Sequence, residues 1–319
     1  MSAPPDLAPS ATMQQIEGQR ARDAAARTRA DNLTAAGWIV LSCLGATVMT
    51  VAIRMMSGDL DSRMIAFLRA ALGLWIVAPW LLDGSWRALR FTRPGLHLFR
   101  GALMAAALNL GFFAIATLEM ATATILFFLA PIFATALAGP MLGESVGIRR
   151  WGAVAAGFVG ALIILRPGAG ALEWGMLAAV GSAACFSISL LLSKTLGAVD
   201  GARSVLVSST AVAAVLTLPI AAPVWSLPGA LEIWAWLGVL VLSSSLRMYA
   251  DIKGYAIGEA GFLAPFSYLR LLFVGAIGWA LFAEIPDAYT WLGGGVIAGA
   301  TLFIAYREAR LNKRIGAVG

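Results

Sequence analysis

The sequence predicts an all-α integral membrane protein, with ten transmembrane helices that form two inverted five-helix repeats. Three observations lead to this prediction. Hydrophobic residues make up 60% of the 319 residues and charged residues only 13%, which is more apolar than a water-soluble core of this size requires. The apolar residues gather in ten segments that short loops separate. The pattern of the first half returns about 140 residues later in the second half.

The ten apolar segments have the length of transmembrane helices. A helix needs roughly 17–25 residues to cross a hydrocarbon core about 30 Å thick, and it satisfies its backbone hydrogen bonds within the segment. In order along the chain, the segments lie at 36–56, 64–82, 97–117, 121–140, 149–166, 173–193, 203–221, 235–256, 261–283 and 288–307. Pro131 removes a backbone donor and predicts a bend within the fourth segment.

These segments form one expected ten-helix domain, residues 36–307, with a polar stretch at each end. Residues 1–35 are rich in Arg, Ala and Asp and lack the apolar stretch of a signal peptide, so we expect a disordered cytoplasmic tail. Residues 308–319 are expected to form a second cytoplasmic tail.

The two repeats, residues 36–166 and 173–307, share several aromatic and acidic positions. Glu119, Glu144 and Trp151 return as Glu259, Glu284 and Trp291. Since each repeat has five spans, an odd number, the two copies must cross the bilayer in opposite directions. Glu144 and Glu284 lie at helix ends, where we interpret them as helix caps or loop partners in preference to proton carriers.

The last segment of each repeat predicts close helix packing. Small residues stand four apart at Ala156 and Gly160 in the first repeat, and at Gly295 and Gly299 in the second. Small side chains allow two backbones to approach each other where lipid offers no hydrophobic drive for helix association.

The basic residues predict the orientation in the membrane. Most of the 23 Lys and Arg fall before the first segment, in alternate loops and after the last segment, which places them on one side. The positive-inside rule makes that side cytoplasmic, so both termini are expected in the cytoplasm. The chain is expected to cross a bacterial inner membrane many times. This distribution accounts for the net charge of +6, and we expect no nucleic-acid partner.

The inventory of reactive side chains argues against an enzyme. His97 is the single histidine, and Cys43 and Cys185 lie inside apolar segments without the spacing of a zinc site. No clustered carboxylates or activated nucleophile are evident. We therefore expect no catalytic residues, no metal and no cofactor, and a monomer whose partners are a small-molecule substrate and the lipid bilayer.

Three ionisable residues mark a candidate substrate site because only one repeat carries them. Arg247 and Asp251 lie in the eighth segment, and Arg270 lies in the ninth, about 14 Å from its inner end. Their counterparts in the first repeat are Ala107, Gly111 and Ala130. A charge at the bilayer centre costs about 2.5–3.5 kcal/mol, which implies a partner or a water-filled cavity.

Two interpretations of these charges stay open. Arg247 and Asp251 are four residues apart, so they share a helix face and could simply pair with each other. That pairing leaves Arg270 for an anionic substrate group such as a carboxylate, which a guanidinium holds through two parallel hydrogen bonds. Lys253 lies nearer the cytoplasmic end and is expected to reach water there.

Further polar and aromatic residues are candidates for the walls of the same site. Asn109 aligns with Tyr249 in the other repeat, so both belong to the same depth in the membrane. The remaining candidates are Tyr268, Ser42 and Phe186. For each of them, ordinary packing is the alternative, because Ser often bonds its own helix backbone and Phe often faces lipid.

The repeated motifs carry a family resemblance. The stretches Glu144-Ser-Val-Gly-Ile-Arg-Arg-Trp151 and Glu284-Ile-Pro-Asp-Ala-Tyr-Thr-Trp291 each precede a Gly- and Ala-rich segment, and Leu263-Ala-Pro-Phe-Ser-Tyr-Leu-Arg270 opens the ninth segment. Together they resemble the drug/metabolite transporter superfamily, EamA type, over nearly everything after residue 35. The resemblance implies ten helices around a central substrate cavity, and within the superfamily it suggests the YddG-like amino-acid exporters.

The expected function is therefore a secondary transporter that exports amino acids or related small metabolites across the inner membrane by alternating access. Two alternatives remain. A carrier of phosphorylated or nucleotide-linked metabolites would need several cationic side chains in its cavity, and a membrane receptor would carry no solute at all. The mixed charge that Asp251 brings to the site favours a zwitterionic substrate over the first alternative.

Overall fold

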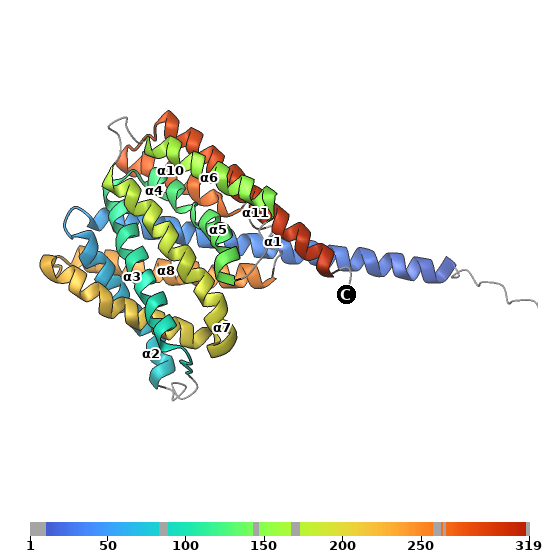
Figure 1. The fold of residues 1–319 in the computed structure, drawn as a ribbon, viewed down its shortest axis with the longest axis horizontal. Coiled ribbons are helices and arrows are strands. Elements are labelled where there is room, and N and C mark those ends of the chain that lie inside the picture. Colours follow the sequence, from blue (N-terminus) through green and yellow to red (C-terminus); the bar gives the residue numbers. More distant parts are fainter. Residues whose placement is uncertain are drawn as a thin grey trace, which may run out of the picture.

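The computed structural model describes residues 11–82, 89–142, 147–166, 173–257, 263 and 266–316, and their regular secondary structure is helical (Figure 1). This confirms the predicted all-α class. In order along the chain, the helices are α1 (Ala11–Met56), α2 (Ser62–Leu82), α3 (Pro94–Thr117), α4 (Met120–Phe127), α5 (Ala130–Leu142), α6 (Ile148–Leu165), α7 (Trp174–Ala221), the short 3₁₀ turn η2 (Ala222–Val224), α8 (Leu231–Ile257), α10 (Leu269–Phe282) and α11 (Ala288–Gly316).

Many of the predicted apolar segments have the properties of membrane spans in the structure. Seven helical stretches of the described chain are long and apolar enough to cross a bilayer, at 31–56, 94–117, 120–141, 148–165, 174–201, 203–224 and 231–254. Two shorter apolar helices, at 269–282 and 288–304, correspond to the ninth and tenth predicted segments. Helix α2 covers the second predicted segment. Large apolar side chains such as Trp75 and Trp174 stay exposed, as expected of a surface that faces lipid.

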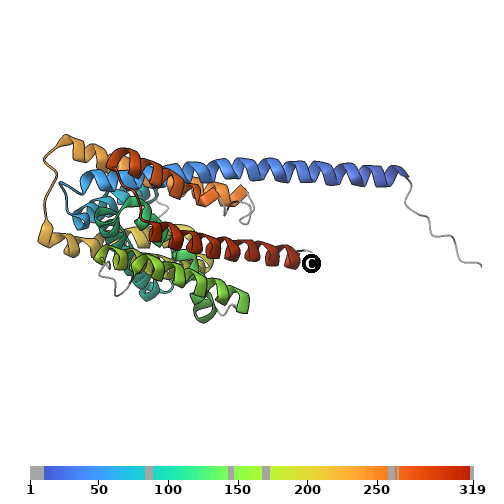
Figure 2. The same cartoon turned by 90° about the horizontal axis from the view of Figure 1, so that it is seen from above.

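Helix α1 begins at Ala11, well inside the region that the sequence led us to expect as a disordered tail. Residues 11–35 contain many Ala, Arg and Gln residues, which favour helix, and hold no proline. Figures 1 and 2 show this part of α1 projecting beyond the bundle. The end of α11 points away from the same end of the bundle, so both described chain ends lie on one side.

Helix α7 joins the sixth and seventh predicted segments around a sharp break at Gly201. The backbone of Gly201 has φ 81° and ψ 154°, a conformation that side chains with a Cβ rarely adopt. The apolar stretches on the two sides of this break, 174–201 and 203–224, are each long enough to span a membrane. The break therefore stands where the sequence analysis expected a loop.

The fourth predicted segment is interrupted between α4 and α5. The interruption lies next to Pro131, where the sequence predicted a bend. Helix α4 ends at Phe127 and α5 begins at Ala130, so Pro131 lies in the first turn of α5, where a missing backbone donor costs little. The ring of Phe128, at the break, stacks on Tyr268, the residue before α10, with 4.7 Å between ring centroids. Phe128 and Tyr268 are repeat counterparts, 140 positions apart.

Close backbone contact joins α6 and α11, which lie side by side in Figures 1 and 2. A Cβ added to Gly160 would lie 2.8 Å from the carbonyl oxygen of Gly293, and one added to Gly293 would lie 2.5 Å from that of Gly160. The prediction for the second repeat was wrong in detail. Gly295 and Gly299 have open space around them, because Gly293 and Gly294 turn toward the neighbouring helices instead.

A single methyl group tests this contact. We expect Gly160→Ala to destabilise the protein by about 1–3 kcal/mol, since the added Cβ must push α11 away. Gly299→Ala is the matched control, because its Cβ meets nothing within 4 Å. Thermal unfolding of the purified proteins in detergent would measure both effects, and equal midpoints for the two variants would contradict the contact.

Candidate functional site

The ion pair that the sequence allowed in α8 is present. An Nη atom of Arg247 lies 3.8 Å from a carboxylate oxygen of Asp251, and the two side chains are 34% and 36% exposed. Arg247 lies about 15 Å before the end of α8 at Ile257, inside a stretch that qualifies as a membrane span. A partly exposed ion pair at this depth is too costly to leave in contact with acyl chains. Its exposed face therefore requires water or a polar ligand.

Arg270 joins this pair from α10. It interacts electrostatically with Arg247 and Asp251, and its Nε is buried without a hydrogen-bond partner in the described structure. The expectation of one unbroken ninth helix was wrong, because the helix is interrupted at Tyr268. Helix α10 begins at Leu269, so Arg270 stands in its first turn, immediately after the interruption at Tyr268.

Arg69 of α2 belongs to the same cluster, and the sequence analysis missed it. One Nη of Arg69 donates a hydrogen bond to the Ser244 hydroxyl across 3.4 Å, and Arg69 also interacts electrostatically with Arg247. A usable signal was available. The repeat counterpart of Arg69 is Val205 or Ser209, depending on where the gap between the repeats falls, so Arg69 shows the same one-sided charge that revealed Arg247.

We define the arginine cluster as Arg69, Arg247 and Arg270. Helix α1 fills the space beside it. Gly45 packs on α8, where an added Cβ would lie 3.1 Å from the Ser243 carbonyl oxygen and 3.4 Å from the Cβ of Arg247. Two residues earlier, the Cys43 thiol lies 3.6 Å from the carbonyl oxygens of Phe266 and Ser267, just before α10.

The other predicted site residues are less closely tied to this cluster. Asn109 donates from Nδ2 to the Ala105 carbonyl of its own helix, while its Oδ1 is buried without a partner in the described structure. The Tyr268 hydroxyl donates to the Ala298 carbonyl on α11. Tyr249 is exposed, packs edge-on against Trp38 and lies beneath the Lys253 ammonium group. Ser42 is buried in α1, and Phe186 is partly exposed on α7.

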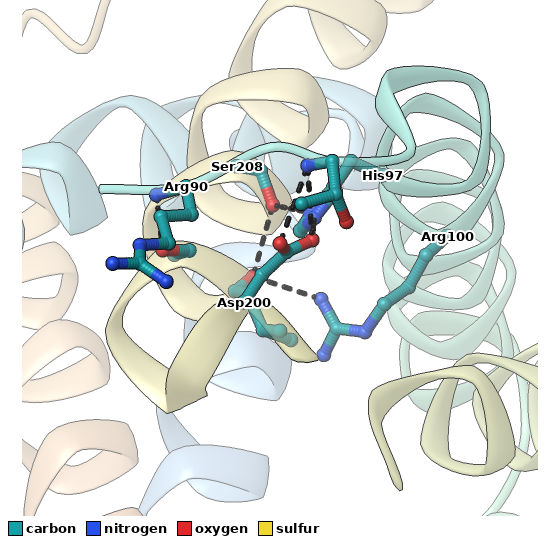
Figure 3. A network of polar contacts seen from close by, with 8 residues as sticks. Arg90, His97, Arg100, Asp200 and Ser208 are labelled. Carbon is teal, nitrogen blue, oxygen red and sulfur yellow. Dashed lines mark hydrogen bonds and ion pairs between the residues drawn. The ribbon is translucent and has the colours of Figure 1, made fainter. Parts of the chain in front are cut away.

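A second polar network ties α3 to α7 near the break at Gly201 (Figure 3). The Nε2 of His97 lies 2.9 Å from a carboxylate oxygen of Asp200, and its Nδ1 lies 2.8 Å from the Ser208 hydroxyl. A carboxylate only accepts hydrogen bonds, so the Nε2–H group of His97 donates a hydrogen bond to Asp200. The backbone N–H of Thr92 donates to the same carboxylate.

This network has the residue types of a hydrolytic triad. Its side chains are buried, however, so it links α3 to α7 and has a structural role. His97 is only 3% exposed and the Asp200 side chain is fully buried, so no substrate reaches the imidazole. The Ser208 hydroxyl also bonds the Val205 carbonyl of its own helix. Arg100 adds a further link, because its guanidinium donates to the carbonyls of Ser189 and Val205, on the two sides of the break.

The opposite end of the bundle is tied by Arg54 and Glu284. The two side chains form an ion pair at 2.9 Å, and Arg54 also donates to the Ala116 carbonyl at the end of α3. The second carboxylate oxygen of Glu284 accepts the backbone N–H of Met120 across 2.7 Å, which caps α4. This confirms the interpretation of Glu284 as a cap and loop partner. Its repeat counterpart Glu144 lies outside the described residues.

A neighbouring ion pair joins α6 to α11 at that end. Arg166, just after α6, pairs with Asp287, and its guanidinium lies 4.6 Å from the centre of the Tyr289 ring. The Asp287 carboxylate also accepts the backbone N–H of Thr290. Burial raises the pKa of Asp287, but these hydrogen bonds and the Arg166 charge outweigh it and leave the pKa below its ordinary value.

The apolar helices and the charged cluster buried within them define a multi-pass helical membrane protein, and the comparisons place it among transporters. The chain belongs to the EamA-like transporter family, whose model matches residues 33–166. It is 30% identical over 280 residues to an S-adenosylmethionine uptake transporter of Rickettsia bellii, covering 88% of this chain and 96% of that protein. This membership fits the expectation of a non-enzymatic function.

Other relatives are named for different solutes. A riboflavin transporter of Rhizobium johnstonii is 30% identical, with coverage of 87% of this chain and 92% of that one. A pseudopaline exporter of Pseudomonas aeruginosa is 26% identical, covering 83% and 94%. A solved crystal structure shares the fold with a TM-score of 0.56 at 18% identity, over 87% of this chain and 98% of that one.

The tie between His97 and Asp200 yields a stability prediction. We expect Asp200→Asn to cost about 1.5–3 kcal/mol, because it removes the charge from a buried hydrogen bond. Asp61→Asn removes the same charge from the exposed pair with Arg63 and should cost at most about 1 kcal/mol. Thermal unfolding in detergent compares them, and a destabilisation by Asp61→Asn as large as that by Asp200→Asn would contradict the assignment.

Proposed function

We propose that the protein is a secondary transporter that exports amino acids or related small metabolites by alternating access between two inverted five-helix repeats. The observation that carries the proposal is the arginine cluster. Arg247 is partly neutralised by Asp251, while the buried Nε of Arg270 has no hydrogen-bond partner in the described structure. A guanidinium with unmet donors inside a membrane bundle is a ready binding group for a substrate anion.

Corresponding contacts in the two halves support the inverted-repeat arrangement. Gly45 of α1 packs on α8, and its counterpart Gly181 in α7 packs on α3, where an added Cβ would lie 3.3 Å from Leu110. The first helix of each repeat thus meets the third helix of the other. The stacked counterparts Phe128 and Tyr268 fit a two-fold axis between the repeats, since residues on such an axis contact their own equivalents.

The charges of the site suit an amino acid. Its carboxylate would accept hydrogen bonds from Arg270, and its ammonium group would lie near Asp251, the carboxylate that the described structure places beside the cluster. The name of the Rickettsia relative supports this substrate class, since S-adenosylmethionine is an amino-acid derivative. The resemblance to amino-acid exporters and the relative named as an exporter support the outward direction, whereas the Rickettsia relative is named for uptake.

A carrier of phosphorylated or nucleotide-linked metabolites is the second candidate. The third cation, Arg69, favours it, because phosphate groups are commonly bound by several arginines.

Reconstituted vesicles decide between these functions. The purified protein is placed in liposomes and tested with a panel of radiolabelled amino acids, nucleotide sugars and phosphate esters, against vesicles without protein. Movement of amino acids supports the proposal, and movement of phosphorylated solutes alone overturns it. Loading solute on either side, with and without an imposed pH gradient, gives the preferred direction and shows whether protons drive transport.

Replacement of Arg270 tests the site itself. We expect Arg270→Ala to lower the transport rate at least about tenfold, the loss that removal of one charge-assisted hydrogen bond predicts. Arg63→Ala is the matched control, since Arg63 pairs with Asp61 at the exposed start of α2. Size-exclusion profiles and melting curves verify that both variants fold. A folded Arg270→Ala protein with an unchanged rate would remove this residue from the site.

A further inference from the structure

We propose that Arg69 binds substrate and that the site is built for a metabolite with two carboxylates, one at each end of the row Arg69, Arg247 and Arg270. This inference rests on the proposed function and specifies its substrate class. It goes beyond a single carboxylate held at Arg270, because the cluster has a second, more distant cation, Arg69, with no acidic neighbour of its own among the described residues.

The hydrogen bond from Arg69 fixes its place along α8. Its partner Ser244 lies three residues before Arg247, on the same face of the helix and about 4.5 Å along the axis. The Arg69 guanidinium also lies close to its own helix, with Nη1 only 3.4 Å from where a Cβ at Gly73 would stand. Arg69 is therefore held beside α8 on the side of Arg247 that points toward Ser244.

Arg270 approaches Arg247 from another helix and from the side of Asp251. Along α1, Gly45 packs on Ser243 and Arg247 while Ile39 packs on Gly254, so Cys43 lies between these two levels, on the Asp251 side, where it contacts the Ser267 carbonyl just before α10. Arg270 interacts electrostatically with both residues of the ion pair and with Cys43. The charge that acts on Arg69, by contrast, is that of Arg247. Arg247 is thus the middle member of the row. The segment of α1 that holds Cys43 and Gly45 contacts both α8 and the approach to α10, so this packing fixes Arg270 relative to Arg247. The hydrogen bond to Ser244 fixes Arg69 relative to the same helix α8.

The charges of this row do not balance. Three guanidinium groups face one carboxylate among the described residues, Asp251, which pairs with Arg247 and lies near Arg270. In the part of the chain that the structure describes, the neutral Ser244 hydroxyl is the hydrogen-bond acceptor of Arg69. Within that part, two positive charges have no counter-charge in a membrane bundle, where each is costly. A substrate with two negative charges would neutralise them.

The shape of the row favours two separate carboxylates over one phosphate. The cations come from three different helices, α2, α8 and α10, with Arg247 between the other two. A single phosphate would gather its arginines around one centre, whereas two carboxylates joined by a short carbon chain match a row with cations at both ends. Each carboxylate accepts two parallel hydrogen bonds from a guanidinium.

Glutamate and glutamine provide the test, because they have nearly the same shape and differ by one carboxylate. Initial transport rates and KM are measured in vesicles that contain the wild-type protein, Arg69→Gln, Arg69→Lys or the control Arg63→Gln. Glutarate and phosphoethanolamine are added as competitors, one with two carboxylates and the other with a single phosphate group. Melting curves with each compound report binding independently of transport.

The inference predicts that wild-type protein prefers glutamate over glutamine at least about tenfold. Arg69→Gln should lose this preference through a higher KM for glutamate, because one carboxylate of glutamate loses its cation. Size-exclusion profiles and melting curves without solute show whether the variant is folded. Arg69→Lys keeps the charge and should retain part of the preference, Arg63→Gln should behave as wild type, and glutarate should compete better than phosphoethanolamine.

The possible failures are distinguishable. If wild-type protein moves neither amino acid but moves phosphorylated solutes, the proposed function itself falls. If it moves glutamine as well as glutamate, or if Arg69→Gln keeps the preference, only the inference about Arg69 and two carboxylates falls. Stronger competition by phosphoethanolamine than by glutarate overturns the two-carboxylate inference in favour of a phosphate group.

Discussion

The cost of placing charge inside a hydrocarbon layer is the constraint on which this structure depends. An ionised side chain among acyl chains is tolerated only when another group of the protein, water or a ligand compensates it. The chain meets this demand in two ways. At the ends of the bundle, Arg54 with Glu284 and His97 with Asp200 are fully paired and hold helices together. In the middle, Arg69, Arg247 and Arg270 share the carboxylate of Asp251 among the described residues. The remaining positive charge must be compensated by water or a ligand.

The scaffold places this incomplete cluster where a substrate could use it. The contact of Gly160 with Gly293 brings α6 and α11 together at backbone distance, away from the arginines. The interruptions at Phe128 and before α10 meet through the stack with Tyr268, and the second of them puts Arg270 in the first turn of its helix. Broken helices near the midplane are how several transporter folds expose backbone and side chains to a solute.

Much of this could be predicted from the sequence, and the exceptions have physical causes. Periodicity and length located the helices, and the spacing of Arg247 and Asp251 gave their ion pair, because both signals are local along the chain. The one-sided charge of Arg69 was visible in the repeats, but its contact with Ser244, 175 residues away, depends on the fold. The buried tie of His97 to Asp200, 103 residues apart, was invisible for the same reason. The helix through residues 11–35 reflects intrinsic propensity, which a composition-based expectation of disorder overlooked.

The central claim, that a water-filled path reaches the arginine cluster, is tested most directly by thiol labelling. In protein whose Cys43 and Cys185 are replaced by Ala, Ser244→Cys places a thiol beside Arg69, and Leu242→Cys places one at a position 72% exposed on the apolar surface of α8. Position 244 is only 6% exposed in this structure, so the account predicts that the open state of the transport cycle exposes it. A charged, membrane-impermeant reagent should then label position 244 in vesicles, transported solute should protect it, and position 242 should stay unlabelled. Absence of labelling at position 244 from either side of the membrane would contradict it.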